Sequence, residues 1–209
     1  MPPGQYRDAL VLFDWNGTIV LDRDRARTAL NEVLAARSLA VLTADDFSSR
    51  FQLPIATMFA ELGVTPNGLA DAEADWNLAM ARTAAPARAG ATETLQTLAD
   101  GAAALGVVSA ASAAAVAADL ERLGLTGRFH SIDAPAVDKT TALRLRRGQT
   151  PRAWYVGDTT YDIRSALAVG YRPVGVAGGY ATVAALRAAG AAIIIDDLRE
   201  LLPLIGSPL

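Results

Sequence analysis

Two acidic motifs contain the residues whose types and spacing could carry chemistry. The first is Asp14-Trp15-Asn16-Gly17-Thr18, which directly follows an unbroken apolar run over residues 9–13. The second is Gly157-Asp158 with Asp162 four residues further on, and it follows a similar run over residues 153–156. Three carboxylates in one cleft would repel one another unless a cation neutralised them. With oxygen ligands and no nearby histidine or cysteine, the ion expected is Mg²⁺.

A hydroxyl and a lysine add to these motifs. Ser109 ends the apolar run 105–108, and Lys139 follows Asp138 at the expected start of a helix. The chain has 19 Lys plus Arg, and Lys139 is its only lysine, which invites a functional reason. Lysine is a compact point charge, whereas arginine is a planar fork. A site that holds one phosphoryl group beside a carboxylate can favour the smaller cation.

The elements that must position these residues are alternating strands and helices. Unbroken apolar runs predict strands buried on both faces. These runs cover residues 9–13, 105–108, 153–156, 174–176 and 192–195, and residues 129–132 form a weaker candidate. Helical spacing follows at Val116, Leu120 and Leu123 and again at Ile163, Ala166 and Leu167, each set ended by a glycine. The alternation predicts an α/β fold with a doubly wound parallel sheet. Ligands bind to such sheets at the carboxyl ends of the strands, where both acidic motifs lie.

Residues 22–86 interrupt this rhythm and contain no convincing strand. Helical patterns occur at Leu30, Val33 and Leu34 and at Leu69, Ala72, Trp76, Ala79 and Met80. Thr43 could cap a further helix that has Asp45 and Asp46 in its positive first turn. We therefore predict an α/β core formed by residues 1–21 and 87–209, with a helical domain, residues 22–86, inserted after the first strand.

Composition excludes several other functions. The chain has no cysteine and one histidine, His130, so disulfides, thiolate chemistry and a two-histidine metal site are ruled out. The net charge of −3 argues against nucleic acid as a main partner. Residues 101–118 carry no charge, but their Ala, Gly and Ser content makes them a poor membrane span. The start, Met1 to Gly4, does not look like an export signal, so a cytoplasmic location is expected.

Taken in order, the motifs resemble those of a known superfamily. Asp14-x-Asn16-Gly17-Thr18, Ser109, Lys139 and Gly157-Asp158-x-x-x-Asp162 each stand at a predicted strand end or helix start. This set resembles the haloacid dehalogenase-like (HAD) hydrolases, and within them the phosphoglycolate-phosphatase-like branch. The resemblance covers nearly the whole chain, and residues 22–86 look like the helical cap of that branch.

The resemblance implies a role for each of these residues in a Mg²⁺-dependent phosphatase that acts on a small phosphorylated substrate. Asp14 would attack phosphorus and form an aspartyl-phosphate, while Lys139 would offset its charge. Ser109, Thr18 and Lys139 would bind the phosphoryl group or shape the loop around it. Asp14, the backbone carbonyl of Asn16 and Asp158 would hold Mg²⁺, and Asp162 would help directly or through water. A monomer or homodimer is expected.

Asn16 departs from the family's pattern. Phosphatases of the family usually have a second Asp at this place, which protonates the leaving oxygen and later activates water. Asn cannot exchange a proton, and such help is typically worth about 10²- to 10⁴-fold in rate. The leaving group of the substrate could need no proton, as with an acyl phosphate, or Asp22 or Asp24 could supply one. The chain could instead bind phosphoryl ligands with little turnover, carry an introduced Asp→Asn change, or perform another reaction of the superfamily.

Alternatives outside the family fit less well. A response-regulator receiver is far shorter and has no helical insert after its first strand. A dinucleotide-binding domain would require Gly-x-Gly-x-x-Gly, which Gly175, Gly178 and Gly179 do not form. Lys139 follows an aspartate rather than the glycine of a phosphate-binding loop, and no Gly-x-Ser-x-Gly motif is present.

Overall fold

The computed structural model describes residues 4–148 and 150–207. It divides the chain into two compact units. The first contains the residues up to 21 and from 86 onward, and the second contains residues 22–85. Pro86 thus belongs to the first unit, one residue from the boundary that the sequence indicated.

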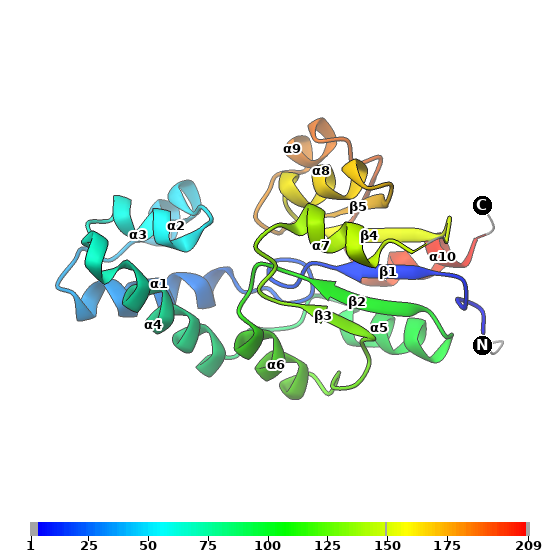
Figure 1. Cartoon of the computed structure of the whole chain (residues 1–209), viewed down its shortest axis with the longest axis horizontal. Helices are drawn as coiled ribbons and strands as arrows, with labels where there is room; N and C mark the ends of the chain where they lie inside the picture. Colours follow the sequence, from blue (N-terminus) through cyan, green and yellow to red (C-terminus); the bar gives the residue numbers. More distant parts are fainter. Residues whose placement is uncertain (1–3, 149, 208–209) are drawn as a thin grey trace. The chain divides into compact units, whose positions relative to one another are not determined.

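The first unit is built on a parallel six-stranded sheet, which confirms the predicted α/β fold (Figure 1). The strands are β1 Leu10–Phe13, β2 Ala104–Val108, β3 Ser131–Asp133, β4 Ala153–Gly157, β5 Arg172–Val176 and β6 Ile193–Ile195. Their order across the sheet is β3-β2-β1-β4-β5-β6, and every neighbouring pair is parallel. The two central strands, β1 and β4, are buried almost throughout, as their unbroken apolar runs predict.

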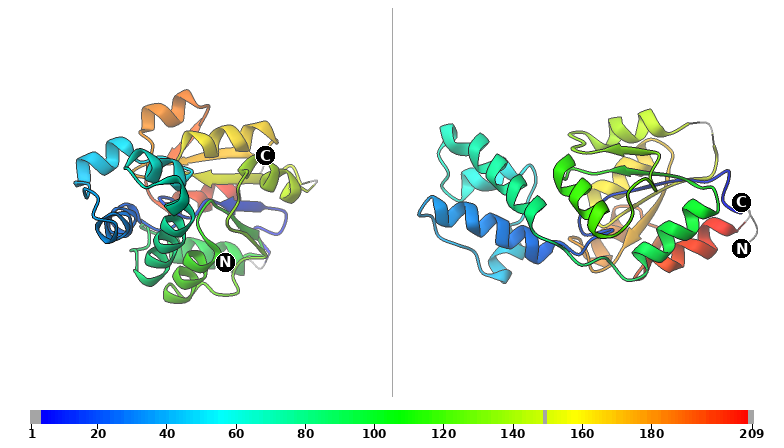
Figure 2. Two further views of the ribbon diagram at one scale, coloured as in Figure 1. Left: turned by 60° about the vertical axis from the view of Figure 1, so that its left-hand side comes forward. Right: turned by 90° about the horizontal axis from the view of Figure 1, so that it is seen from below.

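Helices cover both faces of the sheet. The helices of this unit are α5 Ala91–Asp100, α6 Ala113–Arg122, α7 Lys139–Arg146, α8 Thr160–Ala168, α9 Val183–Ala188 and α10 Leu201–Gly206, with a 3₁₀ turn at Leu198–Glu200. Figure 1 shows α7, α8 and α9 on one face of the sheet. On the other face α5 contacts α10, and the right-hand view of Figure 2 shows these two helices side by side.

The core lies between the sheet and its helices because both present apolar side chains to each other. On the α7–α8 face, one buried cluster consists of Leu12, Val108, Ala136, Leu143, Ala153, Tyr155, Ala166 and Tyr171. At the edge of the sheet β3 is less covered, and Ile132 is 44% exposed. This exposure explains why the apolar signal of that strand is weak in the sequence.

The second unit is helical. It contains α1 Arg23–Ala36, α2 Ala44–Arg50, α3 Ile55–Glu61 and α4 Leu69–Arg82, with a 3₁₀ turn at Pro66–Gly68. The helix α4 packs against both α1 and α3. Thr43 caps α2 by accepting a hydrogen bond from the Asp46 amide, as predicted. Across the described parts of both units, no helix is long and apolar enough to cross a membrane.

Candidate functional site

The strand order brings the two acidic motifs together. Asp14 directly follows β1, and Asp158 directly follows β4, which is hydrogen-bonded to β1. The chain first adds β2 and β3 on one side of β1 and then crosses to add β4 on the other side. Such a reversal opens a crevice at the carboxyl ends of the strands, where open α/β sheets bind their ligands.

Three carboxylates meet in this crevice. One oxygen from each of Asp14, Asp158 and Asp162 lies within 4.8 Å of the other two, and all three residues are buried. Burial raises the pKa of Asp14, and Asp162 adds to this shift, although Lys139 opposes it. Burial, followed by the charges of Asp14 and Asp162, also raises the pKa of Asp158. The group is therefore costly to keep fully ionised without a further positive charge.

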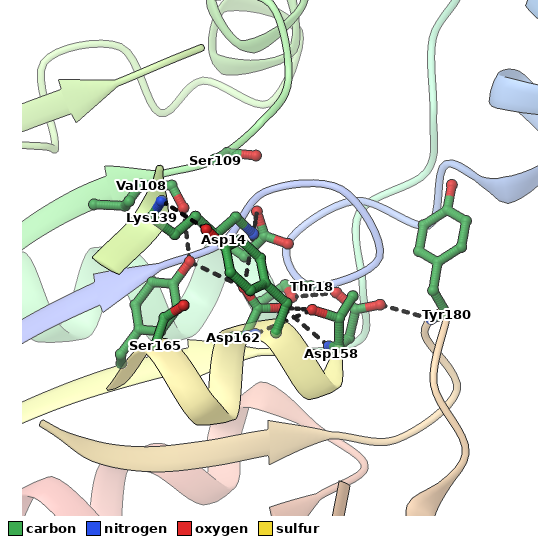
Figure 3. A network of polar contacts seen from close by, with 12 residues as sticks. Asp14, Thr18, Val108, Ser109, Lys139, Asp158, Asp162, Ser165 and Tyr180 are labelled. Carbon is green, nitrogen blue, oxygen red and sulfur yellow. Dashed lines mark hydrogen bonds and ion pairs between the residues drawn. The ribbon is translucent and has the colours of Figure 1, made fainter. Parts of the chain in front are cut away.

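Lys139 stands between two of these acids (Figure 3). Its Nζ lies 3.0 Å from Asp14 Oδ1 and 2.6 Å from Asp162 Oδ1. Burial alone would lower the pKa of Lys139, but the charges of Asp14 and Asp162 outweigh this effect and raise it. The lysine is the first residue of α7, and Asp138 caps that helix by accepting from the Thr140 amide. The helix start thus fixes where the ammonium group enters the site.

Asp162 is held from several directions. It lies in the first turn of α8 and forms a capping box with Thr159, each side chain accepting a hydrogen bond from the other residue's backbone amide. Its Oδ1 also accepts from the Lys139 ammonium and, at 3.2 Å, from the hydroxyl of Tyr155. That hydroxyl lies 2.7 Å from the carbonyl of Val108 at the end of β2. Asp162 therefore joins α8, Lys139 and the sheet.

Two donors fix the Asp158 carboxylate. The Thr18 hydroxyl donates to Oδ1 at 2.9 Å, and the backbone amide of Tyr180 donates to Oδ2 at 2.6 Å (Figure 3). Thr18 belongs to the loop after β1, whereas Tyr180 belongs to the loop after β5. Thr18 was expected to bind the phosphoryl group or to shape the loop around it, and in the structure its hydroxyl donates to Asp158.

Ser109 and Asn16 also lie in the loops at this end of the sheet. Ser109 directly follows β2 and is buried, and its hydroxyl lowers the pKa of Asp14 against the larger effect of burial. Asn16 is half-buried and forms an isolated bridge with Val20, so its backbone closes the turn after Asp14. Trp15, which lies between Asp14 and Asn16 in the sequence, is fully buried and donates its indole N–H to Asp119 at 3.0 Å.

The donor set fits a divalent cation. Three buried carboxylates face one ammonium group, so negative charge exceeds positive charge. All the side-chain ligands are oxygens, which Mg²⁺ prefers. A bound cation would relieve the repulsion that raises the pKa values of Asp14 and Asp158.

Several residues that shape the site were not found from the sequence. Tyr155 lies inside an apolar run, and this position predicts a residue of the hydrophobic core. Tyr180 acts through its backbone amide, which any residue type could supply. A third, Arg88, is buried and donates to the carbonyls of Gly17, Thr18 and Ala177. In a chain with so many arginines this position gave no signal, and a buried cation can be recognised only from the fold.

Known proteins are similar to this chain in sequence pattern and in structure. The family model for haloacid dehalogenase-like hydrolases matches residues 11–176. No curated protein matches. A predicted phosphoglycolate phosphatase from Haemophilus somnus has 19% identity and a TM-score of 0.78, covering 96% of this chain and 98% of its own.

Two further solved structures have the same fold. The protein CbbY from Rhodobacter sphaeroides, in complex with phosphate, has 21% identity and a TM-score of 0.79, covering 92% of this chain and 96% of its own. A haloacid dehalogenase-like family hydrolase from Streptococcus pneumoniae has 17% identity and a TM-score of 0.78, covering 94% of this chain and 97% of its own. At these identities the likeness establishes the fold.

Proposed function

Because this chain belongs to the haloacid dehalogenase-like hydrolase family, we propose that it is a Mg²⁺-dependent phosphohydrolase that forms an aspartyl-phosphate on Asp14. The observation that carries this proposal is the buried cluster of Asp14, Asp158 and Asp162 with Lys139. Its substrate is a small phosphorylated metabolite. A predicted phosphoglycolate phosphatase and a phosphate complex among the similar structures support this substrate class.

The proposed metal site uses oxygen atoms at the carboxyl ends of β1 and β4. Asp14, the backbone carbonyl of Asn16 and Asp158 would hold Mg²⁺. Both oxygens of Asp162 already accept hydrogen bonds from protein groups, so this residue would act through water and through Lys139. When bound, the ion would offset the negative charge of the phosphoryl group.

The first chemical step would form one bond and break another. A carboxylate oxygen of Asp14 attacks phosphorus, and the bond from phosphorus to the leaving oxygen breaks with both electrons passing to that oxygen. Lys139, 3.0 Å from Asp14, reduces the repulsion between the two anions and binds a phosphoryl oxygen together with Ser109. Water then attacks phosphorus, and the bond between phosphorus and the Asp14 oxygen breaks with both electrons returning to the carboxylate. The hydrogens of the water leave on inorganic phosphate, and Asp14 is restored.

Asn16 makes proton transfer the weak point of this scheme. Its amide can hydrogen-bond the leaving oxygen but cannot protonate it, so substrates with good leaving groups are favoured. Acyl phosphates have such leaving groups, whereas alkyl phosphates require a proton. Asn16 also favours a second function, in which the chain binds phosphoryl ligands and turns over little.

Phosphate release from purified protein with Mg²⁺ tests the proposed function. We expect release from acetyl phosphate to exceed release from alkyl phosphomonoesters, and Asp14→Asn should abolish it because the nucleophile is lost. Turnover that persists in Asp14→Asn would contradict the assignment of the nucleophile.

Asn16→Asp separates the two functions. If the native chain is a phosphatase limited by proton transfer, this change should raise alkyl phosphate hydrolysis by about 10²- to 10⁴-fold and acyl phosphate hydrolysis much less. If the native chain releases phosphate from neither acyl nor alkyl phosphates while Asn16→Asp is active, the native chain binds phosphoryl ligands without turning them over. Silence of both proteins across a broad phosphate panel would refute phosphatase activity.

A further inference from the structure

Arg88 is a buried arginine that binds backbone carbonyls from two loops of the site. It is 6% exposed. Its Nε donates to the carbonyl of Thr18 at 2.9 Å, and a terminal nitrogen donates to the neighbouring carbonyl of Gly17. The other terminal nitrogen donates to the carbonyl of Ala177 at 2.8 Å, and the Arg88 amide donates to Ile19. One guanidinium therefore fastens the loop after β1 to the loop after β5.

These two loops enclose the carboxylate of Asp158. Each loop supplies one of the two donors described above, the hydroxyl of Thr18 and the amide of Tyr180. Each also passes a glycine so close to Asp158 that a Cβ on Gly17 or Gly179 would collide with it. Gly17 has φ +74°, a conformation that favours glycine. The position of the carboxylate thus depends on the spacing between the loops.

The chemistry of Arg88 suits this task. Within residues 4–148 and 150–207, no carboxylate lies within ion-pair distance of its guanidinium, and its partners are neutral carbonyls. Burial lowers the pKa of Arg88, while the charges of Asp158 and Asp196 oppose this shift. A planar fork with several fixed donors can join three carbonyls from two directions, which the flexible ammonium of lysine does less well.

We propose that Arg88 is a positioning residue that fixes the Asp158 carboxylate for metal binding by holding the Thr18 and Tyr180 loops together. The inference rests on the proposed function insofar as Asp158 is taken as a Mg²⁺ ligand. Arg88 acts through these two loops and touches neither substrate nor metal. Groups that orient metal ligands typically contribute about 10- to 100-fold to metal affinity.

Calorimetric titration of the metal-free protein with MgCl₂, without substrate, measures this contribution. Arg88→Met keeps most of the side-chain length and removes the donors, and it should raise the Mg²⁺ dissociation constant about 10- to 100-fold. The matched control is Arg152→Met. Arg152 is a partly buried arginine that directly precedes β4, at the opposite end of the sheet, and it donates to the carbonyl of Ile205. That variant should bind Mg²⁺ as the wild type does. Equal affinity in Arg88→Met and wild type would overturn the proposal.

A second measurement reports on the loops without metal. Hydrogen exchange of the Tyr180 amide, followed by NMR in the metal-free protein, should be faster in Arg88→Met and unchanged in Arg152→Met. If the wild type binds no Mg²⁺, the metal part of the proposed function fails, yet faster exchange at Tyr180 would still support the positioning role. Unchanged exchange at Tyr180 together with normal Mg²⁺ binding would refute the role and leave the proposed function intact.

Two milder variants keep the test decisive if Arg88→Met does not fold. Arg88→Lys keeps the charge but loses the fork, so Mg²⁺ affinity should fall by less than in Arg88→Met. Thr18→Val keeps the shape of Thr18 and removes only its hydrogen bond to Asp158, and it should weaken Mg²⁺ binding without any change at Arg88. If both variants bind Mg²⁺ as tightly as the wild type, the proposal is wrong.

Discussion

Residue type at position 139 is set by the space between two acids. The Lys139 ammonium is 3.0 Å from Asp14 and 2.6 Å from Asp162, inside a buried site. A guanidinium is larger and planar, so it could not approach both carboxylates from the same point without displacing one of them. This geometry gives a physical reason for the single lysine in an arginine-rich chain.

Lys139→Arg should therefore lower kcat/KM for phosphate release by at least about 10²-fold, although the charge is kept, because the cation no longer fits between the carboxylates. Steady-state kinetics with acetyl phosphate measures the effect. The matched control is Arg146→Lys, the reverse exchange on the same helix, where Arg146 forms a partly exposed pair with Asp133. It should retain near wild-type activity. Normal kinetics in Lys139→Arg would mean that the site does not require a lysine at this position.

At this scale, sequence could locate residues whose type is chemically unusual in its setting. The acids after the apolar runs and the lone lysine are such residues, and the structure brings Asp14, Asp158, Asp162 and Lys139 together. Arg88 could not be found in this way because its role depends on carbonyl groups far away in the chain.

Among the elements, α8 shows how a helix can serve both the core and the site. Its buried stripe contains Asp162 and Ser165 beside Ile163 and Ala166. The apolar spacing in the sequence indicated Leu167 as part of the buried face, but this residue is 49% exposed. That expectation was wrong because Asp162, which faces the site, and Ser165, which contacts the Thr140 hydroxyl of α7, take buried positions that a purely apolar stripe would use.

Thr159→Ala should separate the contribution of α8 to folding stability from its contribution to the site. It removes the side-chain half of the capping box and should lower the free energy of unfolding by about 1 kcal/mol. It also removes one of the two hydrogen bonds that Thr159 donates to Oδ2 of Asp162, so this carboxylate is held less firmly and phosphate release should fall as well. Thr182→Ala is the control, since Thr182 caps α9 by accepting from the Ala185 amide. Urea denaturation should show a similar loss of stability in both variants, with activity reduced only in Thr159→Ala. Equal activities would mean that the cap serves stability alone.

Strand prediction succeeded where burial is greatest. The runs that became β1 and β4 are apolar because both faces of each strand are covered, whereas β3 lies at the edge with Ile132 exposed. The alternation of strands and helices predicted a parallel sheet. Strand order was not predicted, because short apolar runs carry no information about which neighbour each strand will choose.

For the whole molecule, the site concentrates negative charge in the interior of the first unit. A folded protein usually keeps carboxylates at its surface or pairs them, because a buried charge is costly. Here Lys139 compensates only part of the charge on Asp14, Asp158 and Asp162. The metal-free protein therefore retains a local instability that a cation would remove, so metal binding and folding stability should be linked.

Mg²⁺ should accordingly raise the thermal unfolding temperature of the metal-free protein. At a concentration about 100 times the dissociation constant, the gain is about 2.7 kcal/mol, or about 5 to 10 °C for a chain of this size. Asp158→Asn should remove the shift, and without Mg²⁺ it should unfold no earlier than the wild type because it replaces a carboxylate whose pKa burial raises. Asp75→Asn, which changes an exposed acid paired with Arg37, should keep the full shift. Scanning fluorimetry with and without MgCl₂ measures all three proteins. A shift that survives in Asp158→Asn would place the ion elsewhere.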